Sequence, residues 1–140
     1  MMKTCCGEIV EGKGAVALLV LRLVAGPAFI LHGWGKIQHA TSWMGDMLPG
    51  WLQLLAASAE FFGGMGLLVG LLTHLAALGI AIVMLVAMFW VHIPKGDPFV
   101  GSMEHPSSWE PAADYLAIMI VLLLRGAGVY SLDGLIHKKK

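Results

Sequence analysis

Two charged residues stand in the middle of apolar stretches of the chain, where an acid and a base can exchange protons or hold a polar ligand. Glu60 lies in the run AASAEFFGGMGLLVGLL (residues 56–72), and Arg22 lies in AVALLVLRLVAGPAFIL (residues 15–31). An ionised side chain in apolar surroundings is costly unless it is paired, hydrated or protonated. We therefore expect Arg22 and Glu60 to contact each other.

The composition indicates that these charges lie in a membrane protein. Of the 140 residues, 58% are hydrophobic and 13% are charged. A water-soluble domain of this size cannot bury so much apolar surface. The nine basic and nine acidic residues give no net charge, so nothing indicates nucleic acid as a partner. The partner that the composition indicates is the lipid bilayer.

Four apolar segments have the character of membrane-spanning helices: residues 14–34, 51–72, 75–92 and 111–125. A helix needs about 20 residues to cross the hydrocarbon layer, and the fourth segment is the shortest. Four crossings place both termini on one side, and that side carries most of the basic residues, which predicts that it is cytoplasmic. The sequence thus predicts an all-α, integral membrane four-helix bundle. We expect a single domain over residues 1–140, crossing the inner (plasma) membrane several times.

Neither a cofactor nor a metal is identified by a motif. Cys5 and Cys6 are adjacent and precede the first apolar segment, so a disulfide framework is not indicated. No residues have the spacing of zinc ligands, and we assign none to a metal. Redox chemistry would therefore require a cofactor, a quinone or a partner subunit.

Further polar residues are predicted to lie near the outer membrane edge. Counting the helical rise from the predicted helix ends places Arg22 and Glu60 near mid-membrane and His32 and His92 near the outer edge. The predicted polar column contains Arg22, Glu60, His32, Lys36, His92 and Glu110. Ionisable residues inside a membrane are candidates for function. The alternative is that an ion pair fixes helix register while the edge residues reach water.

Close helix packing is predicted for the second apolar segment. Gly63, Gly64, Gly66 and Gly70 give it a face of small residues, and the Gly66-x-x-x-Gly70 spacing allows a neighbouring backbone to approach.

Four pieces of the chain resemble successive signatures of the DoxX family of small four-helix membrane proteins. They are LLVLRLVAGPAFILHGWGKI, AEFFGGMGLLVGLLTHLAAL, VHIP and GAGVYSLDGL. The resemblance implies recurrent polar positions at Arg22, His32, Lys36, Glu60, His92, Glu110 and Asp133. The chain differs at His74, where an arginine is usual, and in a longer and more acidic loop over residues 95–108.

The resemblance also implies membrane redox work. Family members include small subunits of thiosulfate:quinone oxidoreductase and of an oxidoreductase complex that responds to oxidative or thiol stress. Distant relatives act as assembly chaperones or cargo receptors.

Our leading hypothesis is a redox component that binds a quinone, or a similar aromatic, in the polar column. Donors at the quinone carbonyls and a titratable acid are needed because a quinone gains protons with electrons. The candidate catalytic residues are Glu60, His32 and His92, and the candidate ligand-binding residues are Arg22, Lys36, Glu110 and Trp34.

The main rival is a non-catalytic scaffold or chaperone subunit that anchors a partner oxidoreductase or another membrane protein. Haem ligation by His32 and His92 is chemically sensible but least favoured. Transport would require a homo-oligomer of such short chains. A soluble or membrane redox partner and a homo-oligomer are both compatible with the sequence.

Overall fold

The computed structural model describes residues 3–4 and 7–138, so Cys5, Cys6, Lys139 and Lys140 lie outside the described residues. The described helices are α1 (Gly12–Ile37), α2 (Gly50–Val69), α3 (Thr73–Val86) with its π-helical continuation η2 (Ala87–His92), α4 (Glu110–Arg125) and α5 (Leu132–Lys138). A short 3-10 turn, η1 (Gly45–Met47), precedes α2. Before α1, β1 (Lys3–Thr4) and β2 (Gly7–Glu8) form a two-residue antiparallel ladder.

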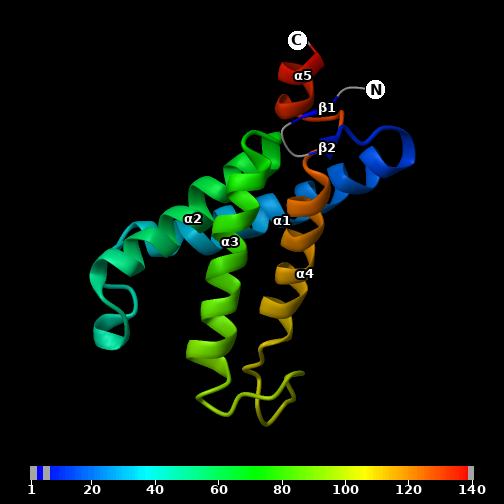
Figure 1. Ribbon diagram of the computed structural model, residues 1–140. Helices are drawn as coiled ribbons and strands as arrows, with labels where there is room; N and C mark the ends of the chain where they lie inside the picture. Colours follow the sequence, from blue (N-terminus) through cyan, green and yellow to red (C-terminus); the bar gives the residue numbers. More distant parts are fainter. Residues whose placement is uncertain (1–2, 5–6, 139–140) are drawn as a thin grey trace.

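The helices form two antiparallel hairpins that cross obliquely (Figure 1). One hairpin is α1 with α2, and the other is α3 and η2 with α4. The strands, the α2–α3 turn and α5 gather at one end of the molecule, here called the terminal end. The loops over residues 38–49 and 93–109 lie at the opposite tips of the two hairpins, and these tips diverge.

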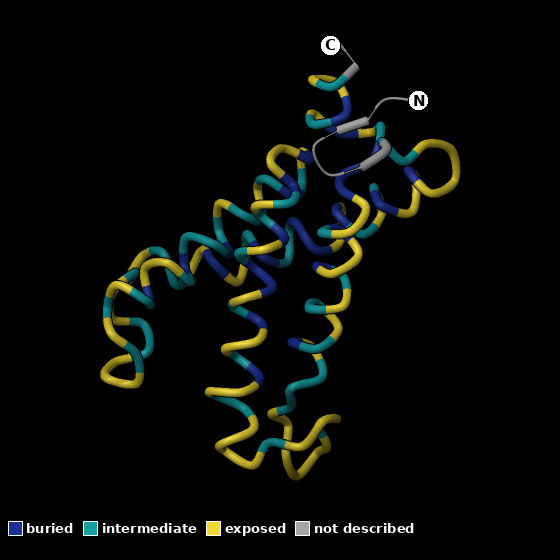
Figure 2. The backbone as a smooth tube through the Cα atoms, in the orientation of Figure 1, coloured by how far each residue is buried: buried dark blue, intermediate teal, exposed yellow. Residues whose placement is uncertain are grey.

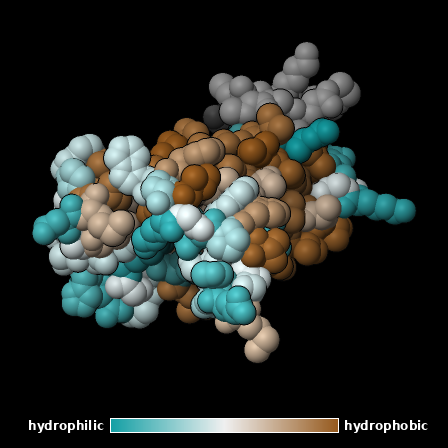
Figure 3. All heavy atoms as spheres, turned by 90° about the horizontal axis from the view of Figure 1, so that it is seen from below, coloured by the Kyte–Doolittle hydropathy of each residue, from teal (hydrophilic) through white to brown (hydrophobic). Residues whose placement is uncertain are grey.

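Apolar side chains cover the outside of the helices, as a lipid environment requires. Buried residues follow the inner faces, while the outer faces are exposed (Figure 2). Seen from the loop tips, hydrophilic residues gather at the tips and the rest of the view is largely hydrophobic (Figure 3). Within the described chain, α1, α2 and the Thr73–His92 helix are long and apolar enough to cross a membrane, whereas α4 has 16 residues. The predicted all-helical membrane fold is confirmed.

Glycines bring the backbones of α1 and α2 into direct contact. A Cβ atom on Gly33 would lie 2.5 Å from the backbone nitrogen of Phe61, and one on Gly64 would lie 2.7 Å from that of Ile30. Small residues permit this approach. Of the predicted glycines, Gly64 makes this contact, whereas the Gly66–Gly70 pair does not. Gly70 ends α2 in the left-handed conformation (φ +69°), where a side chain would be strained.

Candidate functional site

Arg22 and Glu60 do not pair, because the register of α1 against α2 keeps them apart. Gly33 lies against Phe61, so Glu60 is level with Trp34 of α1. Arg22 precedes Trp34 by twelve positions, which is about 18 Å along a helix. The predicted contact was wrong because it assumed that the two helices span the same depths. The Gly33–Phe61 contact instead shifts α2 along α1 toward the loop, so that Gly50 lies beyond the end of α1 at Ile37.

Arg22 instead joins three segments at the terminal end. Its side chain is buried, and its guanidinium donates from Nε to the carbonyl of Leu67 (3.1 Å) and from Nη1 to that of Ala127 (2.7 Å). Nη1 and Nη2 both donate to the carbonyl of Tyr130 (3.1 and 3.0 Å). Leu67 lies in the last turn of α2, where carbonyls lack helical partners and positive charge is favourable. Arg22 therefore has a structural role.

Asp133 has a complementary structural role at the start of α3. Its carboxylate accepts hydrogen bonds from the backbone N–H groups of Leu72 and Thr73, each at 2.9 Å. Its own N–H donates to the carbonyl of Gly70 (2.8 Å). A carboxylate satisfies the free donors and the positive end of a helix N-terminus. This polar position thus fixes the α2–α3 turn.

The partner of Glu60 is Lys36, in the last turn of α1. The Lys36 Nζ donates to Oε1 at 2.7 Å and to Oε2 at 2.6 Å. The Glu60 side chain is 2% exposed, whereas that of Lys36 is 26% exposed. Removal of one member of such a pair leaves an uncompensated charge in an apolar setting. The need of Glu60 for a partner is therefore confirmed, with a different base from the predicted one.

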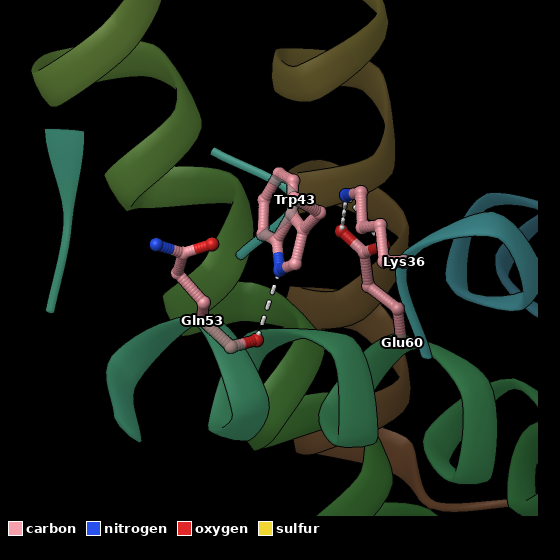
Figure 4. Close-up of polar contacts among 4 residues, drawn as sticks. All are labelled: Lys36, Trp43, Gln53 and Glu60. Atoms are coloured by element: carbon pink, nitrogen blue, oxygen red, sulfur yellow. Dashed lines mark hydrogen bonds and ion pairs between the residues drawn. The ribbon is translucent and has the colours of Figure 1, made fainter. Parts of the chain in front are cut away.

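The loop after α1 folds over this ion pair (Figure 4). The Lys36 Nζ lies 4.6 Å from the centroid of the Trp43 ring, within the range of a cation–π interaction. The Trp43 Nε1 donates to the backbone carbonyl of Gln53 (3.1 Å). The Gln53 side chain is fully buried and holds the loop by hydrogen bonds to backbone groups of Met44, Gly45 and Leu48. Gln53 thus positions Trp43 as a cover over Lys36.

His32 lies four residues before Lys36 and contacts the other hairpin through aromatic rings. The Tyr115 ring of α4 lies edge-on at 6.4 Å from the His32 ring and 4.8 Å from the Phe29 ring, measured between centroids. Residues four apart share a helix face. His32 and Lys36 are therefore brought to one side of α1, where α4 adds Tyr115.

His92 and Glu110 lie at the tip of the second hairpin. His92 ends η2, and its Nδ1 is 2.7 Å from Oδ2 of Asp97. Glu110 begins α4, and its N–H donates to the carbonyl of Phe99 (3.0 Å). Within residues 3–4 and 7–138, no hydrogen bond or ion pair joins either residue to Glu60. The predicted column of six residues is not formed, because the hairpin tips diverge (Figure 1).

The loop over residues 93–109 contains its own polar contact. Asp97 accepts hydrogen bonds from His92 and from the Ser107 hydroxyl (2.9 Å). The hydrogen bond from His92, followed by that from Ser107, holds the pKa of Asp97 below its ordinary value of 3.8. This contact ties the loop to the end of η2.

Trp34, predicted to bind a ligand, is 56% exposed and packs against Phe61 (5.7 Å between centroids). Sequence reasoning missed Trp43, Gln53 and Tyr115. A signal existed for Gln53, since it lies seven residues before Glu60 and so on the same helix face. No such signal marked Trp43 or Tyr115, because their positions depend on loop folding and on how the hairpins cross.

The arrangement brings a hydrogen-bond donor and an acceptor together beside aromatic rings. Lys36 has three N–H donors, and Glu60 accepts from it at two oxygens. Aromatic rings of Trp43, Phe29 and Tyr115 lie beside Lys36 or His32. Among the described residues, no group of three or more His, Cys, Asp or Glu side chains is placed to hold a metal ion.

The chain is similar to known proteins over most of its length. The family described as DoxX matches residues 17–93. The chain is 33% identical over 130 residues to the "Inner membrane protein YqjF" of Escherichia coli strain K12, covering 89% of this chain and 95% of that protein. It is 28% identical over 131 residues to the "Putative oxidoreductase CatD" of Bacillus subtilis strain 168, covering 89% and 90%. No solved structure shows significant similarity to the chain.

Proposed function

The chain belongs to the DoxX family, and we propose that it is the membrane component of a redox system, with a site for a quinone or similar aromatic at Lys36 and Glu60. The observation that carries this proposal is the Lys36–Glu60 ion pair under the Trp43 ring. The relative in Bacillus subtilis, which has oxidoreductase in its name, supports the redox assignment.

The pair has the chemistry that a quinone needs. Reduction of a quinone to a quinol takes two electrons and two protons, and we assign the electrons to a partner redox protein. Lys36 donates a hydrogen bond to one carbonyl oxygen, and His32 is the candidate donor beside it. Glu60 orients Lys36, and the two protons that the quinol gains come from water and are relayed through the pair. The Trp43 ring offers a face on which the quinone ring stacks.

Binding of decyl-ubiquinone to the protein in lipid nanodiscs, followed by calorimetry, tests this proposal. We expect saturable binding that Lys36→Met weakens at least tenfold, about 1.4 kcal/mol. The matched control is Lys95→Met, because Lys95 is an exposed lysine in the loop over residues 93–109. Equal affinity of the two variants would contradict the proposal.

A second variant covers the case in which Lys36→Met does not fold. That change leaves Glu60 buried without a partner, which is destabilising in itself. The double change Lys36→Met with Glu60→Gln removes both charges. We expect it to fold and to bind decyl-ubiquinone as weakly as the single variant.

A second candidate function is a non-catalytic scaffold that anchors a partner protein. The specific observation in its favour is that Arg22, Asp133 and Gln53 all serve to fix the fold. Stoichiometric co-purification of a partner, without any saturable quinone binding, would favour the scaffold.

We also propose that the chain lies in the inner (plasma) membrane with four crossings and both termini in the cytoplasm. The name of the Escherichia coli relative supports the location. The terminal end carries the basic residues Lys13 and Arg125, which supports the orientation. Green fluorescent protein fused to the C-terminus should fluoresce, and a dark but intact fusion would reverse the orientation.

A further inference from the structure

Asp114 is an acidic side chain on the outer surface of α4. It is exposed, as are Ala117, Val121 and Leu124, which follow it on the same helix face. Among the described residues, Asp114 has no hydrogen bond from a side chain and no ion pair. Between Glu110 and Arg125, which lie on this face at the two ends of α4, Asp114 is the one charged residue among apolar ones.

The register of α4 against α3 gives the depth of Asp114. A Cβ atom on Gly126 would lie 3.0 Å from Cε1 of His74, so these positions are level at the terminal end. Counting twelve residues along each antiparallel helix, about 18 Å, makes Asp114 level with Val86. Beyond that level, the exposed side chains of Phe89 and Trp90 continue the apolar surface toward the loop tip.

An ionised carboxylate at this level requires water or a donor, because lipid offers neither. Two further acidic residues lie between Asp114 and water at the loop tip. Glu110 is one helical turn nearer the tip, and Asp97 lies in the loop beyond it. We infer that water reaches Asp114 from the loop tip along this side of α4. Asp114 is then a hydrated carboxylate within the membrane, able to exchange protons with the solution at that side.

This inference rests on the proposed crossing of the membrane by α4, and it does not depend on quinone binding. It identifies Asp114 as a carboxylate within the membrane that exchanges protons with water. Asp114 comes one residue before Tyr115, whose ring contacts His32. Loss of quinone binding would leave it intact, and failure of the inference would leave the Lys36–Glu60 site intact.

Cysteine labelling in proteoliposomes tests the inference. In a background with Cys5→Ser and Cys6→Ser, the variant Asp114→Cys is treated with a charged methanethiosulfonate reagent, and the unreacted thiol is counted by a gel shift. The thiolate attacks the sulfur of such reagents and displaces sulfinate, and the thiolate forms in water but is suppressed in apolar surroundings. The matched lipid-facing control is Val121→Cys, and the water-exposed control is Met103→Cys in the loop.

We expect Asp114→Cys to react at a rate within about tenfold of Met103→Cys, and Val121→Cys to react about a hundredfold more slowly. Substitution at exposed Asp114 removes no packed side chain, so the variant should fold. A rate for Asp114→Cys equal to that of Val121→Cys would overturn the inference, since the position would then face lipid or lie under a partner helix.

Discussion

At the scale of single residues, the surroundings decide what a charge in the membrane does. Arg22 and Lys36 are both basic residues of α1. Within the described part of the chain, Arg22 donates only to backbone carbonyls, which cannot exchange protons, whereas Lys36 donates to a carboxylate. A planar guanidinium suits several fixed carbonyls, and an ammonium suits a point contact with an acid. Arg22 therefore has a structural role, whereas Lys36 is a candidate for a chemical role.

Arg22→Met should destabilise the protein by about 3 kcal/mol or more, because the buried carbonyls of Leu67 and Ala127 and the part-buried carbonyl of Tyr130 lose a charged donor. Arg22→Lys should retain part of that stability, since the ammonium cannot reach all three. Unfolding in a titration with sodium dodecyl sulfate measures the loss. The matched control is Arg125→Met, at an exposed arginine in the last turn of α4. Equal stability of the Arg22 and Arg125 variants would contradict the structural role.

The sequence predicts which charged residues need a partner, but not which residue the partner is. The requirement of Glu60 for a partner could be predicted, because it depends only on a charge in an apolar run. The identity of the partner could not, since it depends on helix ends that shifted by two or three residues and on a glycine contact that sets the register. A lysine near a helix end also has a stem long enough to reach inward.

At the scale of elements, the contact between α1 and α2 depends on glycine. Gly33→Ala should destabilise the protein by about 2 kcal/mol, because the added methyl group meets the backbone of Phe61. Gly35→Ala is the matched control: it lies in the same helix with open space around it and should gain about 0.5 kcal/mol from helix propensity. Thermal unfolding in detergent measures both. Equal effects would show that the helices do not meet at Gly33.

The loop over residues 93–109 should respond to acid. The depressed pKa of Asp97 means that its contacts with His92 and Ser107 stabilise the folded loop at pH values above 3.8. This stabilisation is lost as the pH falls from 3.8 through the lower folded-state pKa. We expect the amide of Glu110, bonded to Phe99, to lose protection from hydrogen exchange over that range.

Amide exchange rates corrected for the intrinsic effect of pH provide the measurement. In Asp97→Asn the response to acid should disappear, and in Glu104→Gln, at an exposed residue of the same loop, it should persist. Loss of protection already at neutral pH would contradict the assignment to Asp97.

The sequence predicts which helices are present better than it predicts their ends and the folding of the loops. Apolar length identified the four main helices near their observed bounds. The π-helical end of α3 and the folding of residues 38–49 over Lys36 were not predictable, because both depend on tertiary contacts such as those of Gln53.

At the scale of the whole molecule, the crossing of the two hairpins determines which polar residues can meet. His32 reaches Tyr115, while His92 and Glu110 remain at the other tip. The sequence predicts the membrane helices and their order, but not the angle at which the two hairpins cross. Equal depth brings residues together only if the helices run alongside one another, and diverging tips remove that condition (Figure 1).

The central claim is that a quinone head group binds at the Lys36–Glu60 pair. Photolabelling with an azido-quinone in membranes, followed by mass spectrometry of peptides, tests this most directly. We predict labels within residues 29–43 and at Tyr115, suppressed by excess quinone and by Lys36→Met. Labels spread over the lipid-facing residues 75–90, unaffected by excess quinone, would contradict the claim.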